Sequence, residues 1–197
     1  MARRHRRVQI DLGTGDGRAA LAAATAEPDT FVIAIDADAR SMAETSRRAA
    51  ARPHRGGLPN LLFVAEGVER IPSAFDGLAD SVTVLFPWGS LLRGALGLDA
   101  AVAASIARLV TPGGSLEIVL SVVDRDRPAI GGAGPFGAAD VDSMSRTFAS
   151  LGLDLVEACP LSTTEIRATG STWARRLRTD PDRPVWRVSL RRGWPVG

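Results

Sequence analysis

The chain has 197 residues, of which 45% are apolar, a size and composition typical of one globular domain with a sizeable core. It contains no run of 18 apolar residues, and its basic start MARRHRRVQI continues into a glycine-rich stretch, so we expect neither a membrane span nor a secretory signal. Cys159 is the only cysteine, which excludes a disulfide framework and a cysteine metal site. We therefore expect a cytoplasmic protein without a metal, in which Cys159 is a buried structural thiol.

The basic residues are all arginines, and they are concentrated in three segments. Residues 1–8, 40–55 and 167–192 carry net charges of +4, +4 and +6, which leaves −12 for the rest of the chain to reach the overall +2. Such segregation is typical of a protein that presents one face to a polyanion. Three solvated surface runs that never converge in space would give the same pattern, and the sequence alone leaves both possibilities open.

Apolar, strand-like runs alternate with amphipathic, helix-like segments along most of the chain. The predicted strands are residues 7–12, 30–36, 60–65, 81–86, 115–121, 153–161 and 184–192. The predicted helices are residues 17–26, 39–52, 98–110 and 138–151, of which the third ends at TPGG and the last at Gly152. With helices between the first five strands and before the sixth, this order predicts an α/β fold with a mostly parallel seven-stranded sheet and helices on both faces.

We expect a single domain, residues 1–197, because neither an internal repeat nor a second compositional unit is visible. Two stretches resist assignment to helix or strand. Residues 122–137 are rich in Gly, Pro, Asp and Arg, and residues 162–184 are rich in Ser, Thr and Arg. Loops of this length in a compact α/β domain are usually functional or disordered, and we expect functional loops.

The strand at residues 81–86 runs into the cluster Phe86, Pro87, Trp88 and Gly89. Because proline cannot donate to a sheet ladder, the strand should end at Pro87, which puts Trp88 at the rim of the sheet. The ordinary role of such a tryptophan is to pack over the end of the sheet.

A glycine-rich turn, DLGTGDG at residues 11–17, follows the first strand and opens the first helix. Glycines allow the backbone to turn sharply and to approach a ligand, and the start of the helix offers unpaired N–H groups. Asp36 ends the second strand, where an acidic side chain can bind a ribose diol. The two elements together predict a nucleotide-type cofactor site.

The spacing of these glycines differs from the G-x-G-x-x-G fingerprint of dinucleotide-binding proteins. The D-x-G-x-G-x-G pattern resembles the first motif of Rossmann-like class I methyltransferases that depend on S-adenosyl-L-methionine (SAM). Three further stretches, RGGLPNLLFV, LFPWGSLLRGALG and STWARRLRTDPDR, resemble the 16S ribosomal RNA adenine-N1 methyltransferases of the kanamycin and apramycin resistance type, over nearly the whole chain. The resemblance implies methylation of adenine 1408 in the decoding site of the assembled 30S subunit, with S-adenosyl-L-homocysteine (SAH) as the product.

The resemblance also implies roles for individual residues. The residues that it assigns to SAM are Asp11, Gly13 and Gly15 at the methionine end, Asp36 at the ribose, Glu69 at the adenine edge, and Leu85, Ser90 and Ser171 as pocket lining. Those that it assigns to the flipped target base are Trp88 and Trp173, which sandwich it, with Phe86 and Pro87 as the pocket floor. Those that it assigns to RNA docking are Arg176 and Arg183, together with Arg47, Arg48 and Arg52 of the arginine-rich helix.

Elementary chemistry agrees with these roles. N1 of a stacked or paired adenine is inaccessible, so the enzyme must take the base out of its stack and hold it between aromatic faces. The neutral N1 lone pair attacks the methyl group directly, and the ring becomes cationic, which indole faces stabilise. The absence of an obvious acid–base dyad in the sequence fits such a reaction.

Three other functions remain open at this point: methylation of another RNA such as a transfer RNA, SAM binding without catalysis, and methylation of a small molecule. Members of the family carry a longer segment, a hairpin, before the first strand, whereas the first strand begins near Val8 here. Either the sequence starts late or this docking element is missing, and in the second case the basic stretch RRHRR would partly replace it through phosphate contacts. We expect the protein to act as a monomer.

Overall fold

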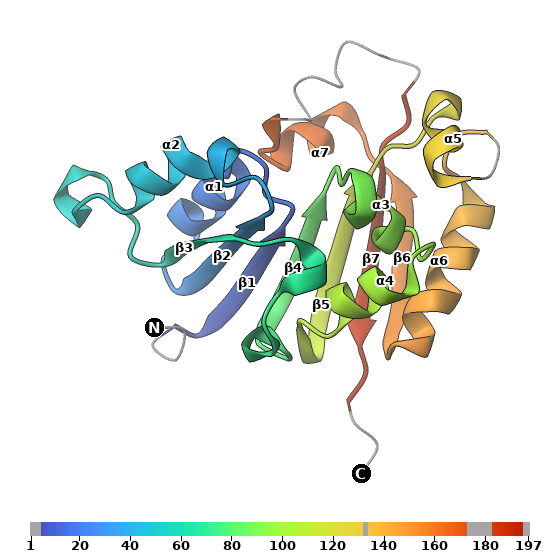
Figure 1. Cartoon of the computed structure of the whole chain (residues 1–197), viewed down its shortest axis with the longest axis horizontal. Coiled ribbons are helices and arrows are strands. Elements are labelled where there is room, and N and C mark those ends of the chain that lie inside the picture. Colours follow the sequence, from blue (N-terminus) through green and yellow to red (C-terminus); the bar gives the residue numbers. More distant parts are fainter. Residues whose placement is uncertain (1–4, 132–133, 173–182, 195–197) are drawn as a thin grey trace.

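The computed structural model describes residues 5–131, 134–172 and 183–194. Seven strands form one sheet in the order β3-β2-β1-β4-β5-β7-β6 (Figure 1). The strands are β1 (Arg7–Leu12), β2 (Thr30–Asp36), β3 (Leu61–Ala65), β4 (Ala79–Leu85), β5 (Val110–Leu120), β6 (Leu153–Pro160) and β7 (Trp186–Arg192).

The first five strands are parallel, whereas β7 lies antiparallel between β5 and β6. The strand order reverses between β1 and β4, because the chain first builds outward to β3 and then returns to the other side of β1. In open α/β sheets, the crevice at the carboxyl ends of the strands beside such a reversal is the usual ligand site. The topology therefore places the glycine-rich turn and the end of β4 next to each other.

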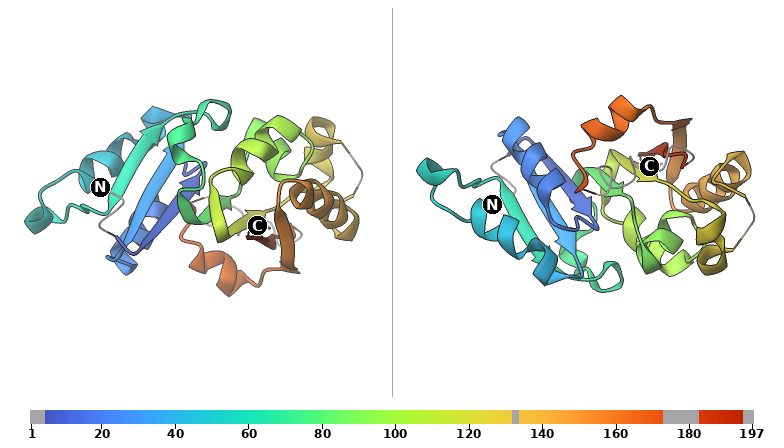
Figure 2. Two further views of the ribbon diagram at one scale, coloured as in Figure 1. Left: turned by 90° about the horizontal axis from the view of Figure 1, so that it is seen from below. Right: turned by 90° about the horizontal axis from the view of Figure 1, so that it is seen from above.

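Helices cover both faces of the sheet, as expected from the sequence (Figures 1 and 2). On one face lie α1 (Arg18–Ala26), α2 (Ala39–Ala49) and the short α7 (Thr163–Ala168). On the other lie α3 (Gly89–Ala95), α4 (Ala100–Ala107) and α6 (Ala138–Ser150), and a single turn of helix, α5 (Arg127–Ile130), precedes α6.

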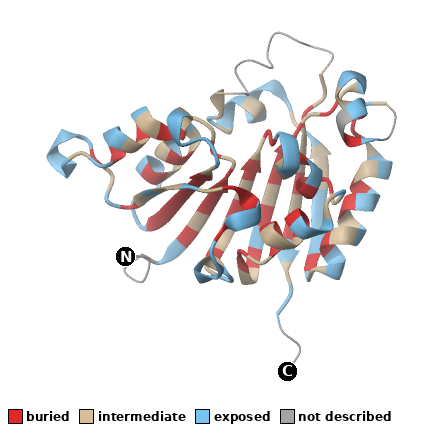
Figure 3. Cartoon of the chain, in the orientation of Figure 1, coloured by how far each residue is buried: buried red, intermediate tan, exposed pale blue. Residues whose placement is uncertain are grey.

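The main core lies between the sheet and α4 and α6, where the buried residues of Figure 3 concentrate. Val82, Val84 and Ile118 of the central strands pack with Ile106 of α4 and Phe148 of α6. On the opposite face, α1 contributes only small residues to a second cluster over β2. Because β2 is covered on both sides, its run from Phe31 to Ile35 is buried without alternation, as expected for a central parallel strand.

Three connections differ from the sequence prediction. No α-helix joins β3 to β4, where two 3-10 turns, Val68–Arg70 and Ser73–Phe75, make the connection. The seven-residue helix α3 follows Trp88, where no helix was predicted. TPGG lies inside β5 as an irregularity of its pairing with β4, since Gly113 has φ of 77° and a Cβ on Gly114 would lie 2.9 Å from the Asp80 carbonyl oxygen.

The prediction that Cys159 is a buried thiol is wrong. Cys159 lies on β6, the edge strand of the sheet, and is only half-buried. Its neighbours Leu155 and Val156 are 37% and 65% exposed, because part of this edge lacks a covering layer among the described residues. The guanidinium of Arg187 lies 3.7 Å from the Cys159 sulfur.

Within the described ranges, no single helix is long and apolar enough to cross a membrane. Taken together, α3 and α4 have sufficient length and apolar composition, but the pair is bent by 78° at its junction. The same ranges contain no group of three or more His, Cys, Asp or Glu side chains placed to hold a metal ion.

A buried amide holds the layer around α1 together. Asn60, only 4% exposed, donates from Nδ2 to the carbonyl oxygens of Ala24, Glu27 and Thr30 at 2.9, 3.3 and 3.0 Å. These acceptors lie at the end of α1 and at the start of β2. Asn60 therefore satisfies carbonyl groups that the end of a helix leaves without partners.

We expect Asn60→Ala to lower the free energy of unfolding by about 2–4 kcal/mol, because it leaves buried carbonyl oxygens without a donor. Urea denaturation monitored by circular dichroism measures the change. Asp29→Ala, an exposed substitution in the same turn, serves as the control and should cost less than about 0.5 kcal/mol. Equal effects of the two substitutions would contradict the assigned role of Asn60.

Candidate active site

A cleft of about 410 Å³ opens at the carboxyl edge of β1, β2 and β4. It contains all eight residues that the sequence assigned to the cofactor: Asp11, Gly13, Gly15, Asp36, Glu69, Leu85, Ser90 and Ser171. Phe86, Pro87 and Trp88 line the same cleft. The structure therefore brings together, from five separate segments, the residues that the resemblance assigned to SAM and three of the four assigned to the target base.

The glycine-rich turn forms one wall of the cleft and is held against the end of β2. The amides of Gly13 and Thr14 donate to the Ile35 carbonyl oxygen at 2.8 and 3.1 Å, and the Gly15 amide donates to Asp36 Oδ2 at 2.8 Å. Gly13 has φ of 75°, and a Cβ there would lie 2.4 Å from Leu91 Cδ2. Glycine is thus favoured at this position by its backbone conformation, since the flexible Leu91 side chain can move away from an added Cβ.

Asp11 lies at the bottom of the cleft and is 3% exposed. Its carboxylate accepts hydrogen bonds from the hydroxyl groups of Thr14 at 2.6 Å and Thr83 at 3.3 Å. Burial raises the pKa of Asp11 to about 6, although both hydroxyl groups oppose the shift, and the nearby Asp36 adds to it. A cationic group bound in the cleft would stabilise the charged carboxylate.

The carboxylate of Asp36 organises two backbone segments. Oδ2 accepts from the Gly15 amide, and Oδ1 accepts from the Asp38 amide, both at 2.8 Å. Each carboxylate oxygen has a second lone pair, so Asp36 can hold the turn and still accept hydrogen bonds from a ligand in the cleft.

The turn after β4 is held in a strained conformation. Phe86 has φ of 51°, the only positive value at a non-glycine position in the described chain, and such strain often occurs at functional sites. Its amide donates to the Val119 carbonyl oxygen at 2.7 Å, and its ring packs with Val119 and Val185. Pro87 is buried, whereas Trp88 is 50% exposed, so Trp88 lies at the rim as predicted.

Glu69 and Ser90 connect two walls of the cleft. Glu69 lies in the 3-10 turn Val68–Arg70, and Ser90 lies in the first turn of α3. A hydrogen bond from the Ser90 hydroxyl group holds the pKa of the Glu69 carboxyl below its usual value. Glu69 therefore presents a charged acceptor to the cleft at neutral pH.

Arg183, which the resemblance assigned to RNA, lies among protein partners in the structure. Its side chain is only 5% exposed and forms an ion pair with Asp126 at 2.7 Å. It also donates to the hydroxyl and carbonyl oxygens of Ser121, at 3.1 and 3.2 Å. In this conformation the guanidinium joins the connection after β5 to the chain entering β7, next to a cavity of about 20 Å³ behind Trp88, and it does not face solvent.

The remaining predicted RNA contacts divide into two groups. Arg47, Arg48 and Arg52 are exposed at the carboxyl end of α2 and in the turn after it, where a polyanion could reach them. Trp173 and Arg176 lie outside the described residues.

Four polar residues of the site were not predicted from the sequence: Thr14, Asp16, Thr83 and Thr172. Thr14 and Asp16 belong to the glycine-rich motif itself, so their positions were visible, but nothing in the motif showed which side chain each would bind. Thr83 and Thr172 reach the site only through the fold, since they bond Asp11 and Asp16 across 72 and 156 residues.

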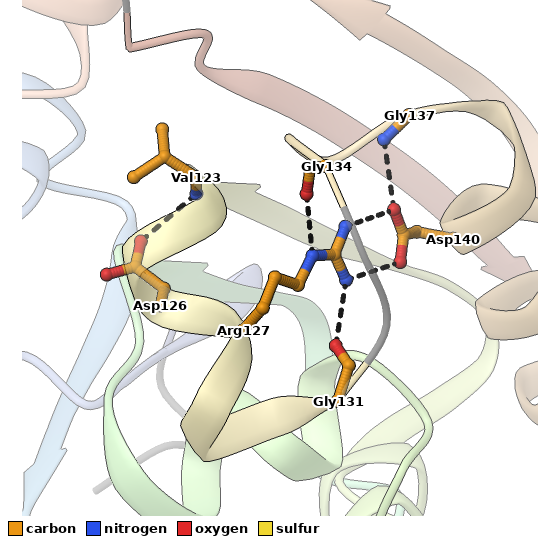
Figure 4. A network of polar contacts seen from close by, with 7 residues as sticks. All are labelled: Val123, Asp126, Arg127, Gly131, Gly134, Gly137 and Asp140. Atoms are coloured by element: carbon orange, nitrogen blue, oxygen red, sulfur yellow. Dashed lines mark hydrogen bonds and ion pairs between the residues drawn. The ribbon is translucent and has the colours of Figure 1, made fainter.

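The connection between β5 and α6 is organised by a buried arginine (Figure 4). Arg127 forms a bidentate pair with Asp140, at 2.9 and 2.8 Å, and donates to the carbonyl oxygens of Gly134 and Gly131 at 2.7 and 3.3 Å. These hydrogen bonds hold the pKa of the Asp140 carboxyl below its usual value. The preceding residue, Asp126, accepts from the Val123 amide and from Arg183. The described residues of this connection are therefore held together by a network of buried hydrogen bonds.

We expect Arg127→Ala to lower the free energy of unfolding by about 3 kcal/mol, because it leaves the Asp140 carboxylate and two carbonyl groups without their donor. Arg127→Lys should recover little, since an ammonium group cannot make the bidentate contact. Urea denaturation provides the measurement, with the exposed Arg146→Ala of α6 as the control. If Arg127→Ala unfolded at the same urea concentration as the wild-type protein, the network would not contribute to stability.

Comparisons with known proteins agree with this geometry. A family model described as NpmA, 16S rRNA (adenine(1408)-N(1))-methyltransferase, matches residues 1–191. The 16S rRNA (adenine(1408)-N(1))-methyltransferase of Streptoalloteichus tenebrarius is 36% identical over 180 residues, which cover 89% of this chain and 82% of the relative. The enzyme of the same name from Escherichia coli is 30% identical over 192 residues, which cover 93% of this chain and 86% of the relative.

Solved structures give the same result. A tryptophan-to-alanine mutant of the 16S rRNA (adenine(1408)-N(1))-methyltransferase from Catenulisporales acidiphilia, with its cosubstrate SAM, has a TM-score of 0.88 at 32% identity, over 100% of this chain and 90% of that chain. The 16S rRNA methyltransferase KamB has a TM-score of 0.87 at 32% identity, over 98% and 90% of the two chains. The chain belongs to the NpmA family of 16S rRNA (adenine(1408)-N(1))-methyltransferases.

Proposed function

We propose that this protein transfers the methyl group of SAM to N1 of adenine 1408 in the decoding site of the assembled 30S subunit, and thereby gives resistance to aminoglycosides. One observation carries the proposal: in a chain of this family, the glycine-rich turn, Asp36 and the Trp88 turn converge on a single cleft. We further propose that the protein acts in the cytoplasm, as a monomer.

The cleft fits SAM in size and in charge. A volume of about 410 Å³ is in the range of small-molecule and cofactor sites. Asp11 supplies a buried carboxylate for the ammonium group of the methionine end, and Asp36 keeps acceptor capacity for the ribose hydroxyl groups. Glu69, Leu85, Ser90 and Ser171 line the remainder and would surround the adenine end.

The base side of the cleft is built to hold a flat ring. Trp88 is half-exposed at the rim, and its turn is anchored by the buried Phe86 and Pro87. Bound SAM supplies a sulfonium methyl group that the neutral N1 lone pair accepts by in-line displacement. As N1 forms the bond, the adenine ring becomes cationic, and the indole face of Trp88 stabilises the developing charge. Since N1 carries no proton before transfer, the chain has to supply orientation and stacking and no general base.

Docking would depend on shape and positive charge. Arg47, Arg48 and Arg52 form an exposed basic group at one end of α2, well suited to phosphate contacts. Phosphate contacts of this kind make affinity fall steeply with salt. Such a group would have no role in the methylation of a small molecule.

Tritiated methyl transfer from SAM to purified 30S subunits tests the proposal. We expect about one methyl group per subunit, a primer-extension stop at adenine 1408, and no incorporation into subunits already methylated there. A stop at another base, or incorporation into transfer RNA alone, would show that the enzyme methylates a different substrate from the one proposed. Absence of incorporation together with calorimetric SAM binding would indicate a binding protein without catalytic activity.

We expect Trp88→Ala to lower methyl transfer to 30S subunits by about 10- to 100-fold, because it removes one stacking face. SAM affinity should change by less than about threefold, since half of this side chain lies in solvent. Trp194→Ala, which truncates a tryptophan that is 76% exposed, is the matched control and should keep full activity. A large loss of SAM affinity in Trp88→Ala would make Trp88 part of the cofactor pocket.

The pKa of Asp11 predicts a pH dependence of SAM binding. In the free protein this pKa is about 6. An ammonium group beside the carboxylate lowers the pKa in the complex, so binding releases a proton whenever Asp11 starts protonated. Affinity should be constant near pH 7 and fall as the pH drops through 6, to about one tenth at pH 5.

Calorimetry between pH 5 and 7 measures this dependence. Asp11→Asn is the control, because it cannot titrate: its SAM affinity should be weaker at pH 7 but constant over the range. A constant affinity in the wild-type protein would show that Asp11 does not face a cationic group of the cofactor.

A further inference from the structure

The described part of the connection between β6 and β7 contacts the cofactor turn through a hydrogen bond. The Thr172 hydroxyl group donates to Asp16 Oδ2 at 2.7 Å, and both residues line the cleft. Asp16 is the acidic residue inside the glycine-rich motif to which neither the resemblance nor the mechanism assigned a role. Thr172 therefore joins the cofactor wall to a segment that lies 156 residues away in the sequence.

Asp16 is fixed from its other sides. Its Oδ1 accepts from the Arg18 amide at 3.2 Å, and its carbonyl oxygen accepts from the Thr45 hydroxyl group of α2 at 2.6 Å. The neighbouring Gly15 carbonyl oxygen accepts from Ser41 at 2.8 Å. These contacts hold Asp16 in place, so it offers Thr172 a fixed acceptor.

The segment that ends at Thr172 is anchored at both ends. Ile166 of α7 packs with the cluster of Phe86, Val119 and Val185 beneath the Trp88 turn. At the other end, Gly170 lies beside α1, where a Cβ on it would be in ordinary van der Waals contact with the Ala19 Cα atom at 3.8 Å. Residues 166–172 thus run from the support of the Trp88 turn to the cofactor turn, and the next residue in the sequence is Trp173.

We propose that Asp16 and Thr172 form a positioning pair that closes the cofactor cleft and couples it to the target-base side. The pair holds Ser171 and Thr172 as a wall of the cleft, and Ile166 of the same segment packs with Phe86 on the target-base side. Its effect on methyl transfer rests on the function proposed above, whereas its effect on cofactor affinity does not.

SAH binding to the full-length protein, measured by calorimetry without ribosomes, tests the cofactor side. Thr172→Val keeps the shape of the side chain but loses the donor, and we expect SAH to bind it about 10-fold more weakly. Thr172→Ser, which keeps the donor, should restore affinity to within about twofold of wild type. Thr164→Val, an exposed substitution on α7, is the control and should bind as wild type does.

A double-mutant cycle separates the pair from other effects of Thr172. Adding Thr172→Val to Asp16→Ala should cause no further loss of SAH affinity, because the bond is already absent. Additive losses, or unchanged affinity in Thr172→Val, would overturn the proposal. A lower thermal midpoint with unchanged SAH affinity would likewise reduce the bond to a structural role.

Methyl transfer to 30S subunits tests the base side. At saturating SAM, we expect Thr172→Val to lower kcat about 10-fold with little change in the KM for subunits. If the wild-type protein binds SAH but methylates no subunits, the proposed function fails, and the calorimetric cycle still decides the role of the pair. If the wild-type protein is active and Thr172→Val keeps its kcat, the coupling to the base side is wrong.

Discussion

The site depends on how closely the glycine-rich turn lies against the end of β2. Gly13 and Thr14 use their amides on the Ile35 carbonyl oxygen, and a Cβ at Gly13 would require the Leu91 side chain to move. These hydrogen bonds hold the turn against the sheet, and Leu91 of α3 lies on its other side. That position leaves Asp11 buried beneath the turn and Asp36 beside it, and it defines where a cofactor can lie.

The Trp88 turn at the end of β4 is likewise held in place by contacts with neighbouring elements. Phe86 has an unfavourable backbone conformation, which persists because its amide is bonded to β5 and its ring is packed in a small apolar cluster. Strain of this kind costs on the order of 1–3 kcal/mol and is kept only where the surroundings hold the residue firmly. The result is an exposed indole at a defined place on the rim, supported by residues that are themselves buried.

Much of this architecture could be predicted from the sequence, because the signals are local. All seven strands were predicted from apolar runs, and the glycine-rich turn and Asp36 from their places at strand ends. The failures concern partners distant in the sequence. Arg183 was assigned to RNA by the resemblance, and its partner in the structure, Asp126, lies 57 residues earlier in a stretch with no recognisable pattern. The bond between Thr172 and Asp16 could not be predicted for the same reason, since the two residues lie 156 apart in the sequence. Cys159 was expected to be buried because the apolar sequence of an edge strand resembles that of a central strand.

The arginines of this chain therefore cannot be treated as one charge distribution. Arg127 and Arg183 are almost fully buried, and each satisfies carboxylate and carbonyl acceptors in the connections after β5 and before β7. A planar guanidinium with five donors suits such places, where several acceptors from different segments must be bound at once. Arg47, Arg48 and Arg52 make no comparable buried pair and face solvent. Among the described residues, Arg127 and Arg183 therefore serve the packing of these connections, whereas Arg47, Arg48 and Arg52 are exposed positive charges.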